Sequence, residues 1–168
     1  MKRIFKTAFL LIATGIFVSC GGGEKEEKQQ IKLGEPAKKE TKKETKATSS
    51  ADMIDMSNKG IGPIKSVTIG DGIDDAMAAK GEDVFGKMCT ACHKMDKKYI
   101  GPKQAGITKR RAPEWIMNMI INPEEMIAND PIAKQLLIES NMAVMANQNI
   151  NEEDARAILE YFRKYDSQ

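Results

Sequence analysis

The sequence predicts a small all-α domain in the C-terminal part of the chain, preceded by a segment with no core of its own. From about Asp71 onward, apolar residues recur at helical spacing, and no stretch alternates as a half-buried strand would. Prolines and N-cap residues divide this part into about four helices. Residues 24–49, by contrast, contain eight Lys and six Glu among Thr, Gln and Ser. This segment is predicted to be disordered, because it cannot bury enough apolar surface to offset its chain entropy.

The predicted helices begin at proline or at good N-cap residues and end before the next break. They run from near Asp74 through Met88, from Pro113 to Asn122-Pro123, from Pro131 to about Ile138, and from the N-cap Asn151 to near the end of the chain. In the last helix, the acidic first turn (residues 152–154) complements the positive end of the helix dipole. Its apolar residues, including Ala155, Ile158 and Phe162, fall on one face.

The first 19 residues have the pattern of a secretory signal peptide. Basic residues precede an apolar run from Ala8 to Val18, which is shorter than the roughly 20 residues that span a bilayer. The run ends in Phe17-Val18-Ser19-Cys20, which resembles the lipobox of bacterial lipoproteins, where the cysteine is lipidated. A plain signal peptide with an incidental cysteine is the alternative. We expect export, with Cys20 as a lipid anchor in a bacterial membrane, facing the periplasm or the cell surface.

The predicted organisation therefore has three parts. They are a lipoprotein signal peptide over 1–19, the lipidated cysteine with a Lys/Glu-rich linker over 20–70, and the helical domain over 71–168. The glycine-spaced stretch 60–72 reads equally as linker or as a loosely packed lead-in. A flexible linker of roughly 50 residues, the length between Cys20 and the helical domain, has an r.m.s. end-to-end distance on the order of 40 Å. The formal net charge is only +2, which argues against a nucleic-acid partner.

One motif carries specific chemistry, the Cys-x-x-Cys-His run Cys89-Thr90-Ala91-Cys92-His93. Residues three and four apart lie on one side of a helical turn. Both thiols can therefore add to neighbouring vinyl groups of one haem, while the adjacent histidine reaches the iron. The motif predicts one covalently attached haem c, bound by Cys89 and Cys92, with His93 as an axial ligand of the iron.

Three other uses of these residues are the alternatives. A structural zinc site needs four ligands, and Cys89, Cys92 and His93 supply three once Cys20 carries lipid. A thioredoxin-like redox pair sits in a βαβ setting, and no strands are predicted here. A structural disulfide is compatible with export but leaves the neighbouring histidine without a role.

Residues on either side of the motif form a recognisable pattern. Gly81 and Phe85 lie on the helix before it, and Tyr161 and Phe162 lie on the last helix. Over residues 75–165 this pattern resembles a class I cytochrome c domain, in which a glycine and an aromatic side chain pack against the last helix. The resemblance implies a small cytochrome c fold of about four helices around one haem.

A second match follows the motif, at Ile100-Gly101-Pro102. The resemblance implies that the carbonyl of Pro102 accepts a hydrogen bond from the free ring N–H of the axial histidine. An ordinary turn is the alternative. Arg110, Arg111 and Trp115 are candidates to hydrogen-bond the haem propionates.

The second axial ligand must be another residue type, because the chain has one histidine. Histidine with methionine is usual for electron carriers and raises the reduction potential. The resemblance places that methionine on the loop before the last helix, where Met142 and Met145 are available. Met145 lies six residues before Asn151 and fits the family's spacing better, so Met145 is expected and Met142 is the alternative.

The resemblance implies a monomeric, membrane-tethered carrier of single electrons between respiratory components, not an enzyme. The stretches 110–119 and 145–149 are similar to small cytochromes encoded beside nitrous oxide reductase in some bacteria. That enzyme is one candidate redox partner and a terminal oxidase is the other, and the sequence leaves the choice between them open. Eight basic residues and one acidic residue between Lys87 and Arg111 are compatible with docking to an acidic protein surface, and an ordinary solvated face is the alternative. The alternative function is a haem enzyme or a gas or redox sensor with an open sixth coordination position.

Overall fold

The computed structural model describes residues 49–168, which are entirely helical apart from loops. The elements are α1 (Asp75–Met88), the 3-10 helix η1 (Ile107–Lys109), α2 (Pro113–Ile121), α3 (Pro123–Asn129), α4 (Pro131–Glu139) and α5 (Glu152–Asp166). The only β pairing in this part is one isolated bridge between Asp55 and Arg111. The predicted all-α class is therefore confirmed. None of the described helices is long and apolar enough to cross a membrane. The predicted signal peptide and Cys20 lie outside the described residues.

Four helices begin where their caps predict, and a fifth, α3, is not predicted by the sequence. Asp74, Asp130 and Asn151 each accept a hydrogen bond from a backbone N–H of the first turn that follows. The predicted end of a helix at Asn122-Pro123 is confirmed, since α2 ends at Ile121, but Pro123 also opens α3, which was not predicted. Proline is suited to the first position of a helix, where its missing N–H has no partner to lose. The same residue therefore reads as a stop for α2 and a start for α3.

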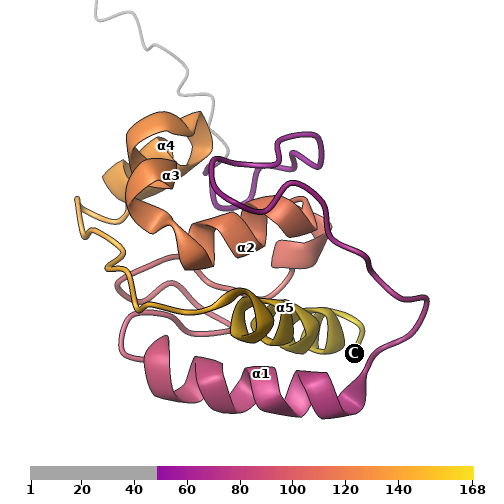
Figure 1. Cartoon of the computed structure of the whole chain (residues 1–168). Coiled ribbons are helices and arrows are strands. Elements are labelled where there is room, and N and C mark those ends of the chain that lie inside the picture. Colours follow the sequence, from indigo (N-terminus) through magenta and orange to yellow (C-terminus); the bar gives the residue numbers. More distant parts are fainter. Residues whose placement is uncertain (1–48) are drawn as a thin grey trace, which may run out of the picture. The chain divides into compact units, whose positions relative to one another are not determined.

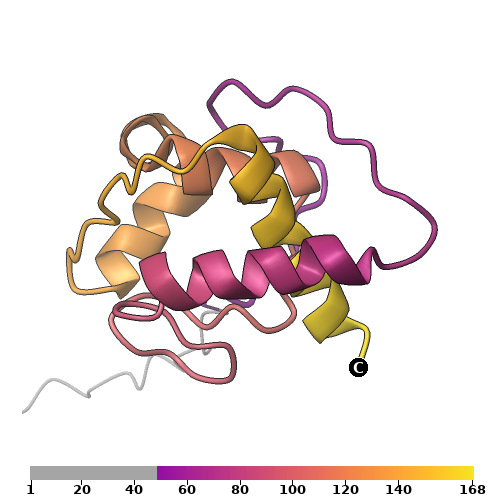
Figure 2. The same ribbon diagram turned by 60° about the horizontal axis from the view of Figure 1, so that its bottom comes forward.

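Helices α1 and α5 lie against each other at the base of the fold (Figure 1) and cross (Figure 2). The closest approach is at Gly81, where a Cβ atom would lie 1.9 Å from the carbonyl oxygen of Ala157. Beside this contact, Phe85 meets Phe162 edge to face, with ring centroids 5.4 Å apart, and Tyr161 at 5.7 Å. Such aromatic pairs add to the stabilisation from burying their area. The predicted pairing of these residues between the two helices is confirmed.

The predicted linker, residues 20–70, extends too far toward the C-terminus, because residues 49–70 pack on the helices. We call residues 49–70 the N-terminal segment; it passes over α2 and then descends to α1 (Figure 1). Ile64 is buried, and the Asn118 side chain both accepts from its N–H and donates to its carbonyl, each at 2.9 Å. Asn118 also donates to the carbonyl of Lys59 at 3.0 Å. The folded domain therefore begins before residue 71.

Arg111 fastens the beginning of the N-terminal segment. Its side chain is buried and donates to the carbonyls of Ser50, at 2.5 Å, and Met53. Next to it, the buried Asp130 accepts from Asn58, at 2.6 Å, and from the indole of Trp115, at 3.2 Å. Amino-acid composition does not reveal this packing, because the segment is held by a few buried polar side chains that lie far from it in the sequence.

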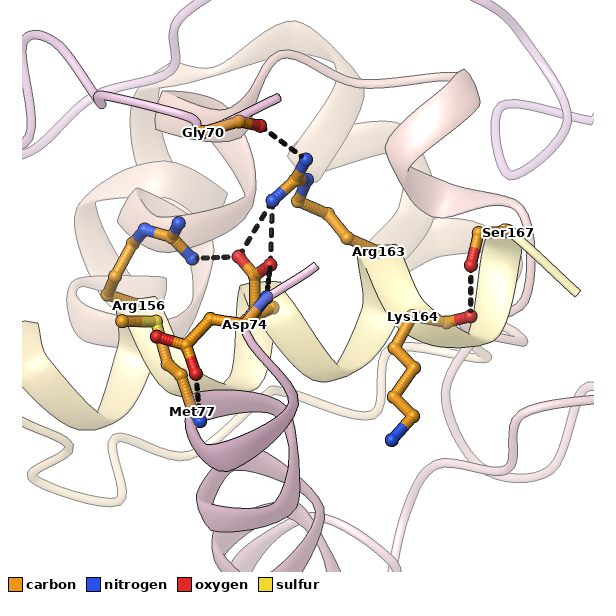
Figure 3. Close-up of polar contacts among 8 residues, drawn as sticks. Gly70, Asp74, Met77, Arg156, Arg163, Lys164 and Ser167 are labelled. Carbon is orange, nitrogen blue, oxygen red and sulfur yellow. Dashed lines mark hydrogen bonds and ion pairs between the residues drawn. The ribbon is translucent and has the colours of Figure 1, made fainter. Parts of the chain in front are cut away.

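A buried carboxylate on α5 joins three parts of the chain (Figure 3). Glu160 is 1% exposed and accepts from Arg156 at 2.6 Å and from Arg163 at 2.7 Å. It also accepts from the backbone N–H of Asp74, which caps α1, at 3.1 Å. Arg163 in turn donates to the carbonyl of Gly70 at 3.0 Å. One charged group thus connects α5, the start of α1 and the end of the N-terminal segment.

We expect Gly81→Ala to destabilise the protein by about 3 kcal/mol, because the new methyl group meets backbone atoms that cannot move away. Gly86→Ala on the same helix is the control, since a Cβ atom added there would meet no neighbouring element within 4 Å. Alanine is the better helix former there and should stabilise by about 0.5–1 kcal/mol. Urea unfolding of both variants measures the two effects, and equal stabilities would contradict the close contact.

The Glu160 cluster predicts a specific dependence of stability on pH. Burial alone would raise the pKa of Glu160, but the hydrogen bonds from Arg156, Asp74 and Arg163 outweigh it and lower that pKa. A lowered folded pKa means that the stabilisation is present above the unfolded value of about 4.3 and is lost as the pH falls through the folded value.

Glu160→Gln should therefore cost about 3 kcal/mol at neutral pH, because it leaves two arginines without their buried partner. The difference from the wild type should shrink as the pH falls below about 4.3, where the glutamate of the unfolded chain becomes protonated, and should vanish below the lower folded pKa, where the native carboxylate is protonated too. Urea unfolding across this range measures both curves. A difference that stayed constant into strong acid would rule out Glu160 as the titrating group.

Candidate functional site

An apolar cavity lies among the five α-helices and two loops, and it gathers the chemistry-bearing residues. Its walls are mostly aliphatic and aromatic side chains, including Phe85, Trp115, Ile116, Leu136 and Phe162. One loop, 89–104, follows α1, and the other, 143–148, precedes α5. No Asp, Glu, Lys or Arg belongs to the lining formed by the described residues. A large apolar group with few polar contacts fits such a cavity.

The Cys-x-x-Cys-His motif turns sharply at the end of α1. The N–H of Cys89 completes the helix by donating to Phe85, and the N–H groups of Cys92 and His93 both donate to the carbonyl of Cys89, at 3.1 and 2.9 Å. This turn brings both thiols and the imidazole to the same cavity. The three residues that the motif singles out are therefore together in space.

The imidazole of His93 is held from two sides. Its Nδ1 lies 3.1 Å from the carbonyl oxygen of Pro102, the contact that the resemblance implies. Gly101 lies flat against the ring, where a Cβ atom would be 2.4 Å from Cε1. With Nδ1 directed at Pro102, Nε2 is left for a metal. Burial lowers the pKa of His93, opposed by the Pro102 hydrogen bond, and the neutral ring is the form that ligates.

Gln104 belongs to the site, although no sequence motif includes it. Its side chain is 7% exposed and lines the cavity. Its Nε2 atom lies 2.8 Å from Nδ1 of His93 and 2.9 Å from the carbonyl oxygen of Pro102. A polar residue two positions after Gly101-Pro102 is the signal that was available in the sequence.

Of the two methionines expected near the site, Met145 lines the cavity and Met142 does not. Met145 is partly buried and lines the cavity from the loop before α5. Met142 is 63% exposed, has a φ of 62° and is not part of the lining. Met119 lines the cavity from α2, whereas Met117 is buried in the core.

All three candidates for the haem propionates donate hydrogen bonds to other groups of the protein. Arg111 donates to backbone carbonyls of the N-terminal segment, and the indole of Trp115 donates to Asp130 at 3.2 Å. The third, Arg110, donates to the carbonyl of Ala105 at 2.8 Å. These hydrogen bonds therefore hold segments of the protein around the cavity.

The alternative uses of the cysteines fit the site less well. Burial, with a smaller contribution from Cys92, raises the pKa of the Cys89 thiol to about 11. A thioredoxin-like nucleophile has a lowered pKa instead. Across residues 49–168, no three His, Cys, Asp or Glu side chains are grouped to hold a metal ion, so a zinc site has too few ligands. A haem fits the apolar walls, the paired thiols and the oriented imidazole.

Comparisons with known proteins agree with this interpretation. The family model described as Cytochrome c matches residues 78–166. Cytochrome c2 of Rhodopseudomonas palustris is 54% identical over 35 residues, which span 21% of this chain and only 30% of that relative. The solved structure of cytochrome c from Rhodothermus marinus is 43% identical, with a TM-score of 0.62, and the match covers 71% of this chain and 95% of that one. An engineered form of the same protein is 42% identical, also with a TM-score of 0.62, covering 71% and 96%.

The family model covers more than half of the chain, and the structural match extends beyond it. Proteins of this family bind one covalently attached haem c with its iron, and the cavity suits that cofactor. The chain therefore belongs to the cytochrome c family as a monohaem member.

Proposed function

We propose that this cytochrome c carries single electrons between respiratory components while a lipid on Cys20 tethers it to a bacterial membrane. When bound, the haem supplies an iron that takes up and releases one electron. The observation that carries the proposal is that one apolar cavity is lined by both His93 and Met145. Two such ligands from opposite ends of the domain sequence would close the iron to other molecules, as a carrier requires.

Each residue of the site has a distinct role in this proposal. Cys89 and Cys92 hold the cofactor through thioether bonds, and His93 ligates the iron through Nε2. Pro102 accepts from Nδ1–H, which fixes the tautomer and the orientation of the ring. Met145 is preferred to Met142 as the second ligand, because Met145 lines the cavity and Met142 points its exposed side chain elsewhere.

The lining of the cavity favours a carrier over an enzyme. General acid–base catalysis needs a titratable side chain beside the reacting atoms. Within the described part of the chain, no acidic side chain, lysine or arginine lines the cavity. A haem enzyme or a gas or redox sensor with an open sixth position is the outcome that an exchangeable sixth ligand would reveal.

The surface around the motif supports docking of an acidic redox partner. Tyr99 and Ile100 are exposed beside the motif, and Met142 and Val144 are exposed on the loop before α5. Lys94 lies over the ring of Tyr99, with its Nζ 5.2 Å from the ring centroid. Exposed apolar side chains among lysines suit a transient complex steered by charge. Nitrous oxide reductase and a terminal oxidase are the proposed partners, and the protein is proposed to act as a monomer.

We expect Met145→Ala to lose the weak methionine-to-iron charge-transfer band of the oxidised, haem-loaded protein and to become high-spin. Loss of the thioether leaves the sixth position to water or to an added ligand, so carbon monoxide and cyanide should bind readily. Absorption spectra extended to the near infrared measure this. Met142→Ala is the matched control on the same loop and should keep the band. A band that survives in Met145→Ala and disappears in Met142→Ala would reverse the assignment, and a high-spin wild type would favour the enzyme or sensor.

The tether is tested separately with Cys20→Ser. Cys20 is the proposed lipid attachment, so the wild-type protein should sediment with membranes and require detergent for release. The variant, exported by the same signal, should appear in the soluble fraction with its haem spectrum unchanged. A wild-type protein that appeared in the soluble fraction without detergent would contradict the lipid anchor and leave the electron-carrier proposal untouched.

A further inference from the structure

The side-chain amide nitrogen of Gln104 lies beside the hydrogen bond between Nδ1 of His93 and the carbonyl of Pro102. The three atoms involved form a tight triangle: Nδ1 of His93, the carbonyl oxygen of Pro102 and Nε2 of Gln104 lie 2.8–3.1 Å from one another. The Gln104 side chain is buried, so water does not compete for these contacts. Burial of an amide is costly unless it is hydrogen-bonded, which gives this arrangement a definite geometry.

The amide of Gln104 donates to the carbonyl of Pro102. Its Nε2 atom lies 2.9 Å from that oxygen, which can only accept. When Nε2 of His93 ligates iron, Nδ1 carries the ring hydrogen and also donates to Pro102. The Pro102 carbonyl, with two lone pairs, is then shared by two donors.

Sharing the acceptor changes the electronic character of the histidine. A ring N–H that donates strongly to a carbonyl makes the imidazole a more basic ligand, which favours the oxidised iron. A second donor on the same oxygen weakens that hydrogen bond. In addition, the positive end of the Gln104 amide dipole lies 2.8 Å from Nδ1, in an apolar cavity where electrostatic effects are large. Both effects disfavour the extra positive charge of the oxidised state.

We propose that Gln104 is a positioning residue that raises the reduction potential of the haem, by sharing the Pro102 carbonyl with His93 and holding the positive end of its amide dipole beside Nδ1. The proposal rests on the proposed ligation of the iron by His93. The reaction concerned is the one-electron reduction of iron(III) to iron(II), with the electron supplied by a mediator and no proton or group transferred.

The test replaces the amide with an apolar side chain of similar length, Gln104→Met, in the haem-loaded full chain. We expect the ratio of reduced to oxidised protein at a fixed applied potential to fall about two- to threefold, which corresponds to about 20–30 mV for one electron. The proton NMR signal of the His93 Nδ1–H in the reduced protein should move downfield, because its hydrogen bond to Pro102 becomes stronger. A residue that only fills space would change neither quantity.

Gln148→Met is the matched control, because it removes an amide from the same cavity lining without a contact to His93 or Pro102. The proposal is supported if the shift in potential and the NMR change occur in Gln104→Met alone, with the methionine-to-iron band retained. It is overturned if both quantities stay at their wild-type values, or if Gln148→Met lowers the potential equally. If Gln104→Met fails to assemble with haem, Gln104→Leu replaces it with the same expected direction. Absence of the methionine-to-iron band already in the wild type would instead count against the proposed function.

Discussion

The backbone contact between α1 and α5 is the constraint on which the rest of the site depends. Gly81 lets the helices approach until the carbonyl of Ala157 occupies the space of a side chain. The aromatic cluster around Phe85 and Phe162 then closes the next turn of the same interface. Because the Cys-x-x-Cys-His motif follows directly from the end of α1, this contact also sets where both thiols and the imidazole meet the cavity.

Buried polar side chains hold the loops and the N-terminal segment in place, and each of these side chains finds its hydrogen-bond partners within the protein. Arg111 and Asn118 bind backbone groups of the N-terminal segment, while Glu160 collects two arginines and the start of α1. In the part of the chain that the structure describes, no buried side-chain nitrogen or oxygen lacks a partner. The apolar cavity is therefore surrounded by a polar framework that holds the loops without intruding on the cofactor space.

Local signals in the sequence were sufficient for most of the fold and for the chemistry of the site. Capping residues such as Asp74 and Asn151 act within one helical turn, and the haem motif is itself local, so both could be recognised directly. The packing of residues 49–70 could not, because it depends on Arg111 and Asn118, which lie far away in the chain. Gln104 lies close in sequence to its two partners, but a polar residue after Gly101-Pro102 is a weak signal, and only the folded loop brings its amide to both His93 and Pro102.

The attachment of the N-terminal segment to α4 has a mechanical meaning. The hydroxyl of Ser49 donates to the carboxylate of Glu139 at 2.6 Å, and the N–H of Ser50 donates to the same group at 3.0 Å. Glu139 is the last residue of α4, immediately before the loop that carries Met145. Tension applied along the chain from its N-terminal side therefore enters the domain at Glu139 and Arg111.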